Sequence, residues 1–204
     1  MKRILKFTLK IALAALAGIL ALLILTVGVL NIAKFVIYSE YYSAKDNLCK
    51  NPGLSDGFVC QGICAVDETD RILVSGYMKD KTASRIYVTD TEDNAYFVKL
   101  SKNGKDFTGH AGGISMNEDT VYIANGSRLY FFSLSALLDA NEGDTVEIGE
   151  GVAVNNSASF CYADEKYVYV GEFHDGGKYV TEHPYETAEG THCAIVCRYT
   201  HDNL

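Results

Sequence analysis

Apolar residues follow two different patterns along this chain. Residues 11–30, IALAALAGILALLILTVGVL, contain no charged side chain, whereas short segments after residue 58 alternate apolar and polar positions. An apolar run of this length is typical of a membrane-spanning helix, because at about 1.5 Å per residue it reaches about 30 Å. Period-two alternation is typical of β-strands with one buried face. The pattern therefore predicts one N-terminal helix followed by a β-rich region.

The residues on either side of the apolar run indicate how it sits in a membrane. Four basic residues precede it, and Lys34 follows it with aromatic residues at positions 35–42. Basic residues mark the cytoplasmic end of a span, and aromatic rings favour the water interface. We expect residues 1–37 to be a single-pass signal anchor in the cell membrane, contacting the lipid bilayer through residues 11–30. The N-terminus is then cytoplasmic and the C-terminal domain extracytoplasmic.

Two alternatives remain open for this segment. A cleaved signal peptide has a shorter apolar region of about 7 to 15 residues, followed by small residues at the cut. Here the run is longer and Lys34 follows it. A buried helix of a soluble protein is the second alternative. The polar, turn-rich residues 38–57 are expected to form a juxtamembrane linker.

A repeated pattern occupies residues 58–204. Three segments share small residues, a short apolar strand, an acidic turn, a second strand and a glycine: QGICAVDETDRILVSGY at 61–77, GGISMNEDTVYIANGS at 112–127 and ASFCYADEKYVYVGEF at 158–173. A third strand recurs at 84–90, 127–133 and 193–200, and a fourth is available at 95–101 and 145–154. We also expect a hairpin turn at 125–127 and one helical turn within 133–140.

Four antiparallel strands that repeat every 40 to 50 residues are typical of β-propeller blades. We therefore expect an all-β fold of three blades, at about residues 58–108, 109–156 and 157–204, the last one incomplete. A β-sandwich is the alternative. Closed propellers have about four to eight blades. The chain is therefore expected to be a fragment of a longer propeller, or else to close a six-bladed ring as a homodimer.

The strand starts QGI, HAGGI and SASF, together with SRIYV and SRLYF, resemble the secreted six-bladed propellers grouped with strictosidine synthase, gluconolactonase and the paraoxonases. The resemblance covers about residues 58–200 and implies a propeller with a central channel. Calcium-dependent lactonases of that group use an inward-pointing set of one Glu, two Asn and an Asp. The inner strand starts here carry Gln61, His110 and Asn156 or Ser159 instead, so that set has no counterpart.

A ligand site is expected where the strand-connecting loops of a propeller meet around its channel. The loops that enter the inner strands contribute three polar residues, and the long polar segment 171–192 contributes three more. Long loops on a rigid scaffold usually carry binding function. The expected ligand-binding residues are Gln61, His110, Asn156, Glu172, His174 and His192.

A calcium or zinc site is an open alternative for the same loops. Glu172, His174 and His192 are metal-ligating residue types, and His110 could complete the ligand set. The regular nine-residue spacing of the C-terminal histidines does not itself favour a metal, because residues nine apart face opposite ways in a strand and in a helix.

The six cysteines are expected to be mostly unpaired. Cys193 and Cys197 lie about 13 Å apart if both stand on one strand, which is too far for a disulfide. Cys64 and Cys161 stand at similar positions of the repeat and are expected to be small buried residues. A bond between Cys49 and Cys60 is the expected exception.

Charge narrows the expected partners. Residues 1–37 hold five basic and no acidic residues, which leaves 13 basic against 26 acidic residues and a net charge of −13 on the remainder. Nucleic acid would be repelled by such a domain. We expect the domain to bind a carbohydrate, peptide or other small ligand at the channel face and not to catalyse a reaction. The alternatives are a metal-dependent hydrolase of lactonase or esterase type, with His110 or His192 as general base, and a scaffold that docks a protein partner.

Overall fold

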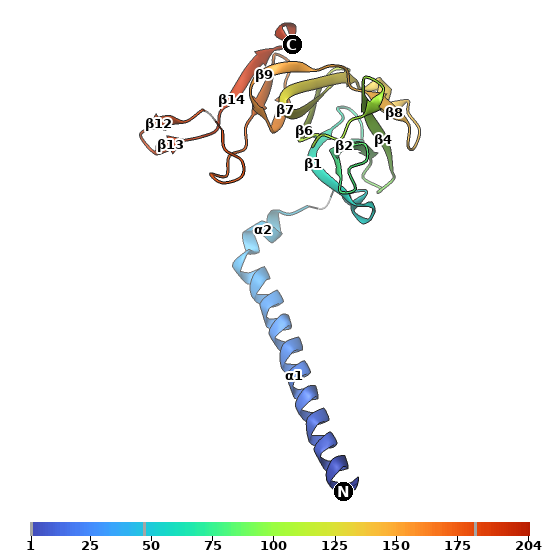
Figure 1. The fold of residues 1–204 in the computed structure, drawn as a ribbon, viewed down its shortest axis with the longest axis vertical. Helices are drawn as coiled ribbons and strands as arrows, with labels where there is room; N and C mark the ends of the chain where they lie inside the picture. The colour runs from blue at the N-terminus through green and yellow to red at the C-terminus, as the bar shows by residue number, and fades with distance from the viewer. Residues whose placement is uncertain (1, 47, 182) are drawn as a thin grey trace. The chain divides into compact units, whose positions relative to one another are not determined.

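The computed structural model of the chain describes residues 2–46, 48–181 and 183–204 (Figure 1). Residues 1, 47 and 182, which fall within the expected anchor, linker and long loop, lie outside the described residues. The contacts divide the chain into two units, Met1–Asn47 and Leu48–Leu204. Part of the expected linker, residues 48–57, thus belongs to the second unit.

The first unit contains the long helix α1 (Lys2–Ile37) and the short helix α2 (Ser39–Ala44). Within α1 the segment Lys6–Ile37 is long and apolar enough to be a membrane span or a signal anchor. Thr8, Thr26 and Asn31 each donate from their side chains to the carbonyl four residues earlier, as when Thr26 Oγ1 donates to Leu22 O at 2.9 Å. Such internal pairing suits a helix in lipid, where water is absent.

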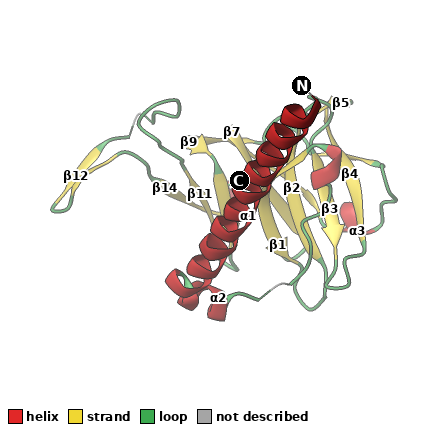
Figure 2. Cartoon of the chain, turned by 90° about the horizontal axis from the view of Figure 1, so that it is seen from below, coloured by secondary structure: helices red, strands yellow, loops and turns green. Residues whose placement is uncertain are grey.

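The second unit consists mostly of strands in several sheets (Figure 2). The first sheet joins antiparallel neighbours in chain order and carries one parallel strand at its edge. Its strands are β1 (Phe58–Ala65), β2 (Ile72–Met78), β3 (Arg85–Thr89), β4 (Ala95–Lys102), β5 (Lys105–Asp106) and the parallel β8 (Thr145–Glu147).

Two three-stranded sheets and one hairpin complete the unit. The second sheet has the order β6 (Gly113–Asn117), β7 (Thr120–Ser133) and β9 (Val152–Ala158). The third has the order β10 (Phe160–Ala163), β11 (Tyr167–Gly171) and β14 (Val196–Thr200). Between β11 and β14 lies the hairpin β12 (Tyr185–Thr187) and β13 (Gly190–His192), and the short helical segments are η1 (Leu54–Asp56), α3 (Ser135–Leu138) and η2 (His201–Asn203).

Strand β7 folds back on itself at residues 125–127. Leu134 N donates to Asp119 O at 2.7 Å, although a straight strand of 14 residues would hold its ends about 46 Å apart. Gly126 adopts φ +61° at the turn, a conformation that favours glycine. The predicted hairpin turn is therefore confirmed. The predicted helical turn is α3, where Asp119 Oδ1 accepts from Ser135 N at 3.1 Å.

The segment 145–154 was expected to be one strand, and this prediction is wrong. Its first part is β8 on the edge of the first sheet, and its last part begins β9 in the second sheet. Gly149 and Gly151 both adopt positive φ and separate the two parts. Glu147 secures β8 by accepting from Ser101 Oγ of β4 at 2.6 Å.

The three sheets pack in chain order, since β6 contacts both β1 and β10. Glycines allow this approach. A Cβ atom on Gly62 would lie 2.7 Å from Ile114 N, and one on Gly113 would lie 2.7 Å from Cys161 N. In the part of the chain that the structure describes, the sheets form an open row and not a closed ring.

These contacts also define how the repeats correspond. Gly62 of the first sheet approaches Ile114 of the second in the same way as Gly113 of the second approaches Cys161 of the third. Gly62 and Gly113 are therefore equivalent, and so are Ile114 and Cys161. Because Ile63 follows Gly62 as Ile114 follows Gly113, Ile63 is the equivalent residue of the first sheet. The sequence comparison had instead placed Cys161 beside Cys64. Cys64 corresponds to Ser115, whose Oγ accepts from Ala163 N of the third sheet at 2.8 Å.

Two apolar layers fill the spaces between the sheets. One contains Leu73, Ile86 and Ile123 from the first and second sheets, and the other contains Leu129, Val168 and Val170 from the second and third. All six side chains are fully buried. Their burial is the main force that holds the row together.

Replacing Gly113 by Ala is expected to destabilise the second unit by about 1–3 kcal/mol, because the added methyl group would overlap the backbone of β10. Urea unfolding of the full chain in detergent measures this. Gly177→Ala is the matched control, since the atom nearest its added Cβ would be Asp175 Oδ1 at 3.8 Å. Equal stability of the two variants would contradict the packing described for β6.

Candidate functional site

A hollow of about 790 Å³ lies where the inner strands of the three sheets begin. We call it the aromatic hollow. It is lined by side chains from β1, β2, the start of β10 and the segments that precede β6 and follow β11. The side chains that matter below are Gln61, Tyr77, His110, Phe160, Phe173 and Tyr179.

His110 lies at the edge of this hollow with an exposed ring. The ring stacks on Tyr77 of β2, with centroids 4.8 Å apart and planes inclined by 26°. Its backbone is fixed, because His110 N donates to Asn125 Oδ1 at 2.7 Å. On either side, Ser84 Oγ donates to Gly109 O and Ser75 Oγ to Ala111 O. The backbone is therefore held from β2, from β7 and from the residue before β3, while the imidazole remains accessible.

Three further rings are exposed around the hollow. Phe160 is 45% exposed, Phe173 is 56% and Tyr179 is 42%. Phe160 lies directly over Gly171, where a side chain would overlap the ring. Phe173 and Tyr179 meet edge to face, with centroids 5.7 Å apart. Exposed rings gathered in a concave site are typical of ligand-binding surfaces.

Glu172 holds the base of the segment that carries Phe173 and Tyr179. Its carboxylate is buried and accepts from Ser157 N at 3.0 Å and Ile195 N at 3.1 Å. His183 Nδ1 lies 2.9 Å from the same carboxylate. Burial acts to raise the pKa of Glu172, but these hydrogen bonds outweigh it and lower the pKa. Glu172 therefore positions the segment and does not face the hollow.

The other expected ligand-binding residues also lie away from the hollow. Asn156 is buried between the second and third sheets, where its Nδ2 donates to Val170 O at 2.8 Å. His174 Nδ1 lies 3.1 Å from Thr181 Oγ1. His192 stands on β13, with Nε2 2.9 Å from Thr187 Oγ1. Of the six residues, the fold brings only Gln61 and His110 together in the hollow.

Sequence reasoning missed the aromatic residues of the site. Tyr77 and Phe160 lie within the repeat segments 61–77 and 158–173, and Phe173 and Tyr179 lie within the long segment 171–192, but none of the four was singled out as a ligand-binding residue. For Tyr77, Phe160 and Phe173 the available signal was a position at or near a strand end, where a side chain is not covered by the next sheet.

The set proposed for calcium or zinc is not gathered at one place. Within the described ranges 2–46, 48–181 and 183–204, no three His, Cys, Asp or Glu side chains are arranged to hold a metal ion. His110 stacks on Tyr77, whereas Glu172, His174 and His192 each contact a different partner.

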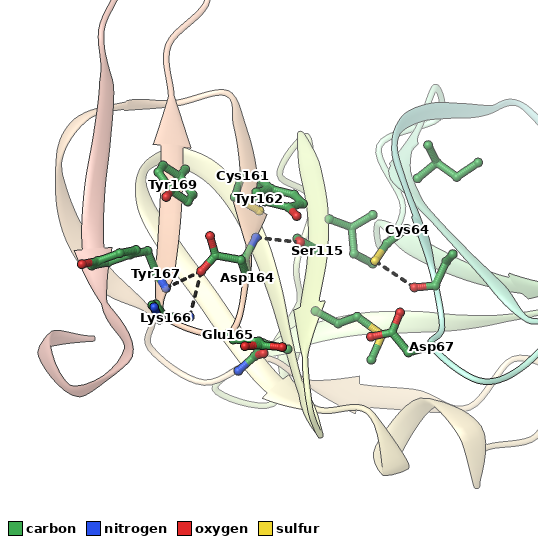
Figure 3. Close-up of a pocket in the computed structure, with 16 residues that line it drawn as sticks. Cys64, Asp67, Ser115, Cys161, Tyr162, Asp164, Glu165, Lys166, Tyr167 and Tyr169 are labelled. Atoms are coloured by element: carbon green, nitrogen blue, oxygen red, sulfur yellow. Dashed lines mark hydrogen bonds between the residues drawn. The ribbon is translucent and has the colours of Figure 1, made fainter.

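A second hollow of about 820 Å³ opens along the inner strands, beside Cys64, Ser115 and Asp164 (Figure 3). Two of its polar groups, Ser115 Oγ and the Asp164 carboxylate, already have protein partners. Asp164 Oδ1 accepts from Lys166 N and Tyr167 N, which lowers the pKa of the carboxyl. Burial raises the pKa of Cys161 to about 12, so its thiol is not nucleophilic near neutral pH. The aromatic hollow is therefore the better candidate for a ligand.

No protein-family model, no curated protein and no solved structure matches this chain. Function must therefore be inferred from the geometry of the aromatic hollow.

Glu172→Gln is expected to lower the free energy of unfolding at pH 7 by about 1–2 kcal/mol, because the amide cannot replace the charged acceptor. The folded-state pKa of Glu172 is lowered, so its contribution is complete above the unfolded pKa of about 4.3 and is lost as the pH falls through the folded value. Urea unfolding from pH 7 to pH 3 measures this.

The exposed Glu165→Gln is the control and should leave the pH profile unchanged. A Glu172→Gln profile that coincides with the wild type would contradict the role assigned to this carboxylate.

Proposed function

We propose that this chain is a single-pass membrane protein whose extracytoplasmic β domain, built from propeller-type blades, binds a carbohydrate, peptide or other small ligand in the aromatic hollow. The domain acts as a binding module and does not catalyse a reaction. Carbohydrate is the ligand class that the exposed rings favour.

The anchor and its orientation rest on the N-terminal helix. Residues Lys6–Ile37 are long and apolar enough to cross a membrane. Basic residues are concentrated before the apolar run, and such residues stay on the cytoplasmic side. The β domain, residues 48–204, then lies outside, where its net charge of −12 keeps it soluble and away from anionic lipid.

Two observations support the blades. Each repeat forms the core of one antiparallel sheet, and successive sheets pack in chain order. Glycines lie where the first strands of neighbouring sheets approach, as expected near the crowded axis of a propeller. Further sheets of a longer chain, or a second copy, would complete the ring.

The observation that carries the ligand proposal is the set of exposed rings around one hollow. Its volume of about 790 Å³ lies in the range of about 300–1,000 Å³ usual for ligand sites. The apolar faces of sugar rings stack on aromatic side chains, and each ring buried by a ligand is removed from water. Gln61 adds an amide at the edge of the hollow.

Tyr179→Ala is expected to weaken oligosaccharide binding by about tenfold, because one stacking face is lost. A glycan array with the purified full chain identifies the ligand, and calorimetry in detergent measures the affinity. Tyr185→Ala is the matched control, since Tyr185 is an exposed tyrosine of the same inserted segment but lies outside the hollow.

His110→Ala should weaken binding similarly without loss of stability, because its ring is exposed. Equal binding by the Tyr179→Ala and Tyr185→Ala variants would contradict the site. Binding of peptides but not of sugars on parallel arrays would replace carbohydrate by peptide as the ligand class.

Protease added to intact cells is expected to remove an epitope tag placed after Leu204 and to leave a tag placed before Met1 intact. Permeabilised cells should lose both tags, which provides the control. Protection of the C-terminal tag in intact cells would exclude the proposed orientation.

A further inference from the structure

Cys49 and Cys60 lie over the outer face of the first sheet. That face carries a buried cluster formed by Phe58, Ile72, Val74, Met78 and Tyr87, and both cysteines are partly buried against it. The same two cysteines also line one hollow of about 310 Å³. Asn51, two residues after Cys49, donates from Nδ2 to Cys60 Sγ at 2.7 Å. Both thiols therefore belong to one packed site.

A β-bulge separates Cys60 from its nearest neighbour in sequence, Cys64. Cys60 stands opposite Gly76 but Gly62 stands opposite Ser75, so one extra residue is inserted between them. Residues 60 and 64 would share a face in a regular strand, and the bulge reverses this. Cys64 consequently packs against the layer between the first and second sheets, away from Cys60.

The remaining cysteines lie on another sheet. Cys161 is buried in the layer between the second and third sheets, and Cys197 stands opposite Val170 in the third sheet. Cys193 lies three residues before the start of β14 of that sheet. Cys49 is therefore the cysteine that the fold brings to Cys60.

Contacts of the residues that follow Cys49 fix the chain in this position. Lys50 N donates to Asp93 Oδ1 at 2.7 Å, and Lys50 Nζ lies 2.6 Å from Asp93 Oδ2. Gly53 then packs under the ring of Tyr87, and Phe58 N donates to Gly53 O at 3.2 Å. The chain thus reverses between the two cysteines and returns along β1.

We propose that Cys49 and Cys60, which the structure records as free thiols, form a disulfide in the mature protein. The proposal rests on the extracytoplasmic location proposed above, because disulfides persist in oxidising compartments. The bond would fasten the first residues of the β unit to its first strand. It would also keep the apolar cluster covered at the point where the linker enters the domain.

The oxidant is a disulfide of the glutathione or oxidoreductase type. One cysteine thiolate attacks a sulfur of this disulfide and releases one thiol. The second cysteine thiolate then attacks the mixed disulfide and releases the other. Two protein thiols and one oxidant disulfide thus become one protein disulfide and two thiols, with two electrons passed to the oxidant and no net change in protons.

The first experiment uses the purified full chain in detergent, equilibrated in a glutathione redox buffer and then alkylated. Trypsin should release residues 46–50 joined to residues 51–71, and fragmentation should place the bond on Cys60 and not on Cys64. Reduction should lower the midpoint of thermal unfolding by about 5–10 °C. Free thiols at both positions in this buffer would overturn the proposal.

Variants exclude a general effect of the reductant. Cys49→Ser and Cys60→Ser should each abolish the thermal shift, whereas the double variant Cys193→Ser/Cys197→Ser should retain it. If a serine variant does not fold, the peptide map of the wild type still decides the question. A bond between Cys49 and any cysteine other than Cys60 would also overturn the proposal.

The second experiment separates this proposal from the proposed location. Thiols are trapped by alkylation in living cells before the full chain is isolated. A bond present there supports both proposals. Free thiols in cells overturn the proposal of a disulfide in the mature protein. If the bond nevertheless forms in the redox buffer, the cysteine geometry is correct and the proposed extracytoplasmic location is wrong.

Discussion

The close approach of β6 to β1 and β10 is the contact on which the rest of the β unit depends. Strand backbones come this near only where side chains are absent, and Gly62 and Gly113 provide that space. The approach allows the apolar faces of successive sheets to bury one another. It also places the beginnings of three inner strands beside one another, and the aromatic hollow forms there.

The hollow combines a rigid part with an inserted part. His110 and Tyr77 belong to the rigid part, because side-chain hydrogen bonds hold the backbone around His110. Phe173 and Tyr179 belong to the segment inserted between β11 and β14, and Glu172 fixes its base. A buried carboxylate that accepts from three donors suits this task. If the segment moved away, the carboxylate and its donors would be left unpaired away from water, which would lower the stability of the fold. The site thus uses a charged residue for position and aromatic residues for contact.

Sequence patterns predicted the strands well where alternation and turn residues agreed. The hairpin at 125–127 follows from the local preference of glycine for positive φ, whereas the helical turn at 135–138 also depends on Asp119, which accepts from Ser135 N across the sheet. The segment 145–154 was mispredicted because two positive-φ glycines, and a hydrogen bond that Ser101 Oγ donates to Glu147, divide it between two sheets. Local periodicity does not report which sheet a strand joins.

By itself, the sequence determined the apolar helix, the β-rich repeats and the position of His110 before an inner strand, because these depend on composition and spacing over a few residues. The tertiary structure decided which residues share a site. Asn156 and Glu172 turn inward to satisfy buried backbone groups, whereas Phe173 and Tyr179 turn outward toward the hollow. It also placed Cys60 and Cys64 on opposite faces of one strand. The direction in which each of these side chains points depends on which surfaces the neighbouring sheets cover. Those surfaces are fixed only when the sheets pack.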